Sequence, residues 1–172
     1  IQLISAFVQI LLNQSLKHYG TALSIGSFTT ISTIYNLVMM PVVGINQGMI
    51  PIIGYNFGQR NYTRVKKTFL QGTIASTIIF TLGFLLIYIL PTPLVSFFNP
   101  DKTFINTTVT ELKLYAFSLP LCALSLTAPN FFQSIGNSKL SIWLVIIRQM
   151  IILIPALIIL PRLIGLNGVW LA

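Results

Sequence analysis

Two long stretches without any Asp, Glu, Lys or Arg constrain this chain more than any other feature of its sequence. The first lies between Lys17 and Arg60, and the second runs from Thr68 to Pro100. As an α-helix, residues 68–90 would be roughly 34 Å long, whereas the hydrocarbon core of a bilayer is about 30 Å thick. A stretch of this kind predicts a helix that crosses a membrane.

The composition supports the same interpretation. The 172 residues are 55% hydrophobic and 7% charged, whereas soluble domains carry about 25% charged residues. A soluble body of this size could not enclose so much apolar surface. The net charge of +8 comes from basic residues at the ends of apolar segments, which is typical of membrane topology and not of nucleic-acid binding. We therefore expect an all-α, polytopic membrane protein with lipid around it and no nucleic-acid partner.

The sequence predicts five membrane-spanning helices and the start of a sixth. The expected spans are residues 1–14, 22–54, 68–90, 112–135, 140–160 and 165–172. The chain begins without Met inside one apolar run and stops inside another. We therefore expect residues 1–172 to form one membrane lobe that is truncated at both ends.

Basic residues predict the orientation of these spans. Arg60, Arg64, Lys66 and Lys67 fall close together before the third span, and cytoplasmic loops are enriched in Lys and Arg. We expect this segment, together with Lys139, on the cytoplasmic side. The connection over residues 93–110 is expected outside.

The second span carries an unusual set of helix-breaking and small residues. They are Pro41, Gly44, Gln47, Gly48, Pro51, Gly54 and Gly58. Glycines four positions apart let two helices approach closely, and prolines bend a helix. The set is therefore expected to be a packing and gating motif. A plain helix contact with two kinks would give the same pattern.

Residues 44–58, read as G-x-x-Q-G-x-x-P-x-x-G-x-x-x-G and followed by Arg60-Asn61-Tyr62, resemble the multidrug and toxic compound extrusion (MATE) family. The resemblance continues through Tyr115 and Pro120, through Phe132, Gln133 and Gly136, through Arg148-Gln149 and Pro155, and into residues 165–170. It covers the region from the seventh to the start of the twelfth family helix, which makes this chain the C-terminal half.

The resemblance implies a twelve-helix antiporter of two lobes in a bacterial plasma membrane. Entry of protons or sodium ions would drive export of small organic cations by alternating access, with the N-terminal lobe as partner. No cofactor besides the coupling ion is expected. A flippase for lipid-linked or polysaccharide precursors has a related architecture and stays as the alternative. An intramembrane enzyme is not expected, because its metal would need clustered acids and this chain has two separated ones.

Several residues are candidates for lining a substrate cavity, because methionine adapts its shape and aromatic faces attract organic cations. They are Tyr35, Asn36, Met39, Met40, Tyr115, Asn130 and Gln133. For each of them, packing or a hydrogen bond between helices is the competing interpretation. Arg148 is a charge inside the fifth span, where it would either face the lobe interior or reach toward the cytoplasmic interface.

The two acids are Asp101, in a loop, and Glu111, near the outer end of the fourth span. We expect Glu111 to be hydrated and paired with a nearby base, which would make it a weak switch. On this argument the carboxylate that couples ion entry to export lies in the upstream half.

Overall fold

A computed structural model describes residues 22–164, together with Ile10, Leu12, Gln14 and Gly168. All regular elements in this part are helices, which confirms the predicted fold class. They are α2 (Ala22–Gly58), α3 (Tyr62–Ile89), α4 (Pro91–Ser96), α5 (Lys102–Ala116), α6 (Leu119–Ser134), α7 (Ser138–Ile146), the π-helix η1 (Ile147–Leu153) and α8 (Ile154–Ile164). The predicted first span and the sixth lie almost wholly outside the described residues.

Three helices of the described part are long and apolar enough to cross a membrane: Leu23–Gly58, Tyr62–Ile89 and the continuous run Ser138–Leu160. They correspond to the predicted second, third and fifth spans. Pro41 and Pro51 lie inside α2 without ending it.

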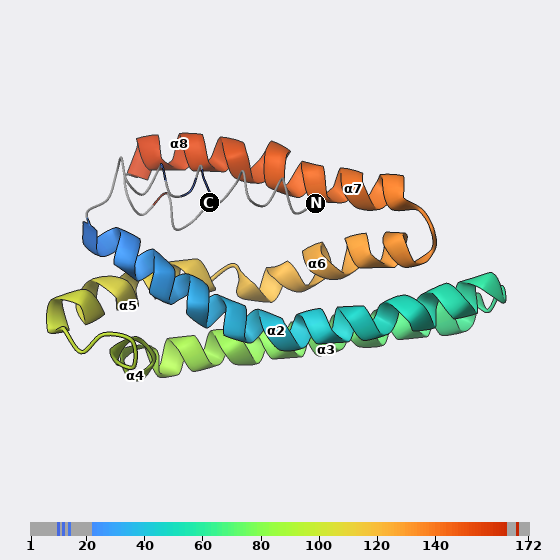
Figure 1. Cartoon of the computed structure of the whole chain (residues 1–172), viewed down its shortest axis with the longest axis horizontal. Coiled ribbons are helices and arrows are strands. Elements are labelled where there is room, and N and C mark those ends of the chain that lie inside the picture. Colours follow the sequence, from blue (N-terminus) through green and yellow to red (C-terminus); the bar gives the residue numbers. More distant parts are fainter. Residues whose placement is uncertain (1–9, 11, 13, 15–21, 165–167, 169–172) are drawn as a thin grey trace.

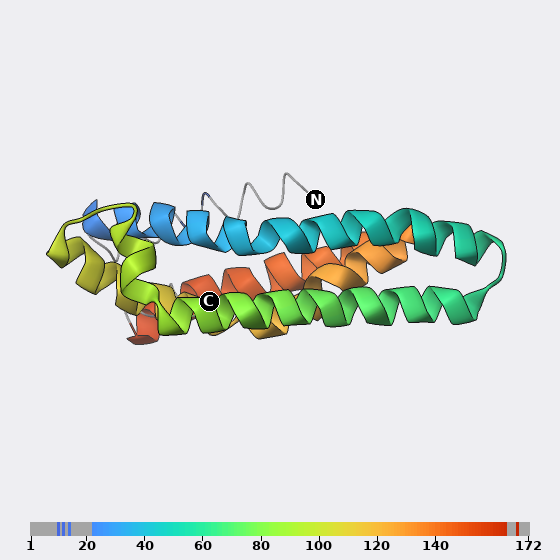
Figure 2. The ribbon, with the colours of Figure 1, turned by 90° about the horizontal axis from the view of Figure 1, so that it is seen from below.

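A tight turn joins α2 and α3, which lie side by side and antiparallel (Figures 1 and 2). The N–H of Asn61 donates to the carbonyl of Asn56 over 2.9 Å, and the N–H of Arg60 donates to the carbonyl of Phe57 over 3.0 Å. This pair of bonds is a Schellman motif. Arg60 has the positive φ of 58° that the motif requires.

The basic segment over residues 60–67 was predicted to be a loop, but most of it is helical. Asn61 is the N-cap of α3, and its side chain accepts a hydrogen bond from the N–H of Arg64 over 3.3 Å. The helix therefore begins six residues before the predicted boundary at Thr68. Arg64, Lys66 and Lys67 lie on its first two turns.

The prediction that residues 112–135 form a single helix is also wrong. It is broken between Ala116 and Leu119, and α5 extends back into the segment that was predicted to be a connection. Pro120 stands at the start of α6. Its ring would clash with the carbonyl of Ala116 in a continuous helix, and it has no N–H to donate. The short α4 likewise starts on Pro91.

The last helical run changes its winding in the middle. α7 and α8 are α-helical, while η1 between them has π-helical hydrogen bonding. Pro155 follows η1 and has no N–H for the carbonyl of Ile151, which its ring also crowds. The wider π turns before the proline relieve that crowding. Such π segments are rare and often occur at functional sites.

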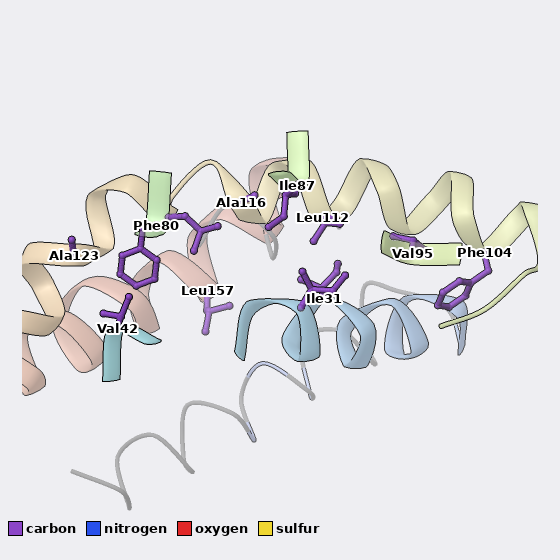
Figure 3. Packing of buried hydrophobic residues seen from close by; sticks show 12 residues of the cluster. Ile31, Val42, Phe80, Ile87, Val95, Phe104, Leu112, Ala116, Ala123 and Leu157 are labelled. Carbon is purple, nitrogen blue, oxygen red and sulfur yellow. The ribbon is translucent and has the colours of Figure 1, made fainter. Parts of the chain in front are cut away.

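One hydrophobic core joins α2, α3, α4, α5, α6 and α8. Ile31, Phe80 and Leu112 are fully or almost fully buried in it, and Leu157 reaches it from α8 (Figure 3). Two hydroxyl contacts add polar links: Ser27 to Thr108 at 2.8 Å, between α2 and α5, and Thr73 to Thr127 at 3.3 Å, between α3 and α6. Such bonds and close packing hold membrane helices together, because lipid gives them little hydrophobic drive to associate.

Two turns lie at the same end of the bundle, the α2–α3 turn and the α6–α7 turn, while α4 and α5 lie at the other end (Figure 1). Lys139, at the start of α7, is therefore at the same end as Arg60 and Arg64. This grouping agrees with the predicted topology. Which end faces the cytoplasm stays a prediction.

Candidate functional site

The exposed side of α2 differs from the exposed side of α3. In α2, one face carries Met40 together with polar, small or helix-bending residues at intervals of three or four: Thr29, Thr33, Asn36, Met40, Gly44, Gln47 and Pro51. All of them are exposed, and we call this set the α2 stripe. The buried residues Ile31, Val42 and Ile53 lie on the opposite side of the helix.

The exposed side of α3 is mostly aliphatic by contrast, with the exposed Gln71 as an exception. It carries Leu70, Ile74, Ile78, Leu82 and Leu85, each at least 44% exposed. Such a face suits lipid chains, which cannot hydrogen-bond. An amide facing those chains would be costly. The α2 stripe, with Asn36 and Gln47, is therefore the candidate surface for contact with protein or water.

Hydroxyl groups on the stripe are satisfied within the helix itself. Thr29 donates to the carbonyl of Ile25 over 3.2 Å, and Thr33 donates to the carbonyl of Thr29 over 2.8 Å. These bonds lower the cost of placing threonine in a membrane-spanning helix. Neither threonine was singled out from the sequence, although their spacing with Asn36 was a usable signal.

The glycines of the predicted motif have different surroundings in the structure. A Cβ added to Gly44, Gly48 or Gly58 would meet no atom within 4 Å, so these glycines border open space in the described part of the chain. A Cβ on Gly54 would lie 3.1 Å from the carbonyl oxygen of Ser134 at the end of α6. Gly54 therefore packs inside the lobe. Gly44, Gln47 and Pro51 belong to the stripe, and their gating role stays a prediction.

The predicted cavity-lining residues also fall into separate groups. Asn36 and Met40 lie on the α2 stripe, and Gln133 is exposed on α6. Tyr35 and Tyr115 pack edge to face, with ring centroids 5.5 Å apart, beside the main core. Met39 packs against the same core. The structure thus brings the two tyrosines together away from the stripe.

Asn130 and Arg148 both bond to backbone carbonyls. The Asn130 side chain donates to the carbonyl of Leu126 over 3.0 Å. Arg148 Nη1 donates to the carbonyl of Ser125 over 3.2 Å, which connects η1 to α6. Arg148 lies about 15 Å along the helix from Ser138. The bond joins Arg148 to a neighbouring helix of the same lobe, and the functional role of the charge stays a prediction.

The structure contradicts the expectation that Glu111 is hydrated. Its side chain is 4% exposed on α5, one turn after Thr108, whose hydroxyl contacts Ser27 of α2. Phe117 and Ser118, which follow α5, form a break inside the predicted span. The carboxyl group is therefore buried between helices and not hydrated as predicted, so the argument that made it a weak switch fails.

Comparison with curated proteins gives one recurring relative. The chain is 26% identical over 170 residues to the multidrug export protein MepA of Staphylococcus aureus (strain bovine RF122 / ET3-1), covering 97% of this chain and 36% of that protein. It is 28% identical over 138 residues to MepA of Staphylococcus haemolyticus (strain JCSC1435), covering 78% of this chain and 30% of that protein. The chain therefore spans about a third of the length of these relatives.

Solved structures show the same fold. A crystal structure of MATE in complex with MaL6 superposes with a TM-score of 0.92 at 20% identity, covering 99% of this chain and 39% of that one. The structure of the MATE multidrug transporter DinF-BH gives a TM-score of 0.83 at 34% identity, covering 98% of this chain and 38% of that one.

The sequence model of the MatE family matches residues 1–159. This match covers nearly the whole chain, and the MepA relatives are from bacteria, which agrees with the predicted multi-pass location in a bacterial plasma membrane. The chain therefore belongs to the multidrug and toxic compound extrusion (MATE) family and corresponds to the C-terminal half of such a transporter.

Proposed function

We propose that the transporter containing this chain is an antiporter that exports organic cations, driven by protons or sodium ions and working by alternating access. The α2 stripe is the observation that carries the proposal. It gives a membrane-spanning helix a polar face directly opposite its buried face. The similarity to MepA, named as a multidrug export protein, supports the substrate class.

In this proposal the α2 stripe borders the path between the two lobes. Met40 is 67% exposed, and its flexible thioether suits substrates of varied shape. Asn36 and Gln47 supply amide groups that hydrogen-bond to substrate or water. Gly44 and Gly48, without side chains, leave room for a bulky substrate or for the N-terminal lobe to approach.

Glu111 is the coupling candidate that this half contributes. A buried carboxylate inside a membrane is costly, and such groups usually mark ion or proton pathways. Ser27 and Thr108 place two hydroxyl oxygens at the same α2–α5 contact. This proposal replaces the expectation that Glu111 is a weak switch. Glu111→Gln should impair the coupled step.

The test is ethidium export from energised vesicles that contain the full-length transporter, with an imposed proton or sodium gradient. Glu111→Gln should lower the gradient-driven rate by roughly tenfold or more, within the range of removing a group that takes part in proton transfer. The matched control is Asp101→Asn. Asp101 is the exposed N-cap of α5 and accepts a hydrogen bond from the N–H of Phe104 over 3.1 Å, and asparagine caps helices equally well.

The control should keep export within about twofold, because it removes an equal charge without touching the buried site. Unchanged export in Glu111→Gln would indicate that the coupling carboxylate lies in the upstream half. If the unmodified transporter moved no ethidium under either gradient, the antiporter proposal itself would fail. Flipping of a fluorescent lipid in the same vesicles would then be measured for the flippase alternative.

A further inference from the structure

A shallow groove lies on the first turns of α3, at the end of the molecule that holds the α2–α3 turn. Its lining residues are Tyr62, Thr63, Lys66, Lys67 and Leu70, and its volume is about 440 Å³. Both lysines are exposed. Tyr62 is 59% exposed, and its ring stands 5.9 Å from that of Phe57. The groove thus combines two ammonium groups with apolar and aromatic walls.

The charge of this groove is not balanced within the chain. The sequence has only two acids, Asp101 and Glu111, and both belong to the α5 region at the opposite end of α3 (Figure 1). Arg60 and Arg64 add positive charge next to the groove. The positive end of the α3 dipole lies there as well. The groove therefore favours an anion.

The groove opens onto an apolar surface. Leu70 is 55% exposed in the groove itself, and Ile74 and Ile78 follow it at four-residue steps with exposed fractions of 50% and 54%. Residues at this spacing are neighbours on a helix surface. A ligand that fits both parts has an anionic head beside the lysines and a hydrocarbon chain along α3.

We infer that this groove binds the headgroup of an anionic phospholipid, in the leaflet that faces the α2–α3 turn. The lipid phosphate lies between the ammonium groups of Lys66 and Lys67, and one acyl chain lies on Leu70 and Ile74. Tyr62 occupies the headgroup level, where tyrosine is enriched in membrane proteins. Basic clusters next to a membrane span bind anionic lipids in this way. Lipid binding does not require the proposed transport activity.

The experiment measures binding of phosphatidylglycerol to the purified full-length transporter in detergent by native mass spectrometry, with the zwitterionic phosphatidylcholine as the comparison without net charge. The test variant is Lys66→Gln with Lys67→Gln. The matched control is Arg60→Gln with Arg64→Gln, which removes the same charge from the same end of the molecule but leaves the groove lining intact. All four residues are exposed, so neither pair disturbs the core, and monodispersity on size exclusion verifies this.

The lysine pair should weaken phosphatidylglycerol binding by about 25-fold, since each basic residue near an anionic surface contributes about fivefold. The arginine pair should weaken it by less than about fivefold, because Arg60 and Arg64 do not line the groove and attract the headgroup only over a longer, screened distance. Equal losses in both variants would show that the lipid is attracted by the overall positive charge of this end, and this would overturn the groove as a site. Unchanged binding in the lysine pair would also overturn it.

A second arm separates lipid from free phosphate. Glycerol 3-phosphate, which carries the anionic group without acyl chains, should not displace phosphatidylglycerol at equal concentration, and Leu70→Ser should weaken only the lipid. Full displacement by glycerol 3-phosphate would show a phosphate site and overturn the lipid assignment.

Discussion

At the scale of single residues, the turns that end α2 and α6 have the same backbone conformation but different residues at the position with positive φ. Arg60 closes α2 with a φ of 58°, and Gly136 closes α6 with a φ of 81°. At the second turn the N–H of Asn137 donates to the carbonyl of Phe132 over 2.9 Å, as Asn61 does to Asn56 at the first. Only the first turn uses a residue with a Cβ, which is disfavoured in the left-handed region.

Exchanging these residues should therefore change stability in opposite directions. Arg60→Gly should raise the free energy of unfolding of the full-length protein by about 1 kcal/mol, and Gly136→Ala should lower it by about 1 kcal/mol. Unfolding in a titration with SDS gives both values. Gly58→Ala is the control, because Gly58 is helical and its added Cβ would meet nothing within 4 Å. A loss of stability in Arg60→Gly would contradict the argument.

At the scale of elements, the α2–α3 contact depends on glycines that the sequence motif did not include. A Cβ on Gly83 would lie 2.5 Å from Cγ1 of Val38, and a Cβ on Gly72 would overlap the Sδ of Met49. Valine is stiff, because it is branched at Cβ, whereas methionine adapts. The two helices are therefore less tolerant at Gly83 than at Gly72.

We expect Gly83→Ala to destabilise the lobe by about 1–3 kcal/mol, the usual range for overpacking a tight contact. Gly72→Ala should cost less. The comparison is Gly44→Ala, which meets no atom in the described part of the chain and should be neutral or slightly stabilising. Adding Val38→Ala to Gly83→Ala tests the cause, because it removes the methyl groups in the way. Failure of this second change to restore stability would place the strain elsewhere.

At the scale of the whole molecule, the bundle has one basic end and one end that holds both acids. Arg60, Arg64, Lys66, Lys67 and Lys139 lie at the end with the α2–α3 turn, and α4 and α5 lie at the other (Figure 1). The positive-inside rule places the basic end in the cytoplasm.

Cysteine labelling of whole cells tests this orientation. In a full-length version without Cys122, Thr103→Cys should react with an impermeant thiol reagent and Gln59→Cys should not. Both positions are exposed, so protection by protein does not account for a difference. Permeabilised cells provide the control, in which both cysteines should react. Labelling of Gln59→Cys alone in intact cells would show that the orientation is the reverse of the predicted one.

The sequence by itself determined the fold class and most of the long helices. Charge-free stretches have to become helices in a membrane, because a helix satisfies its own backbone there. The motif over residues 44–58 also pointed to the correct family. The MATE assignment thus rested on local sequence that tertiary context does not alter.

The tertiary structure alone decided which residues share a surface. Packing of α5 against α2, where Thr108 contacts Ser27, accompanies the burial of Glu111, although its sequence position suggested a hydrated site at a membrane surface. Gly72 and Gly83 became contact points only because Met49 and Val38 of α2 stand opposite them. Helical spacing shows which residues lie on one face, but only the packed neighbours show whether that face meets lipid, another helix or open space.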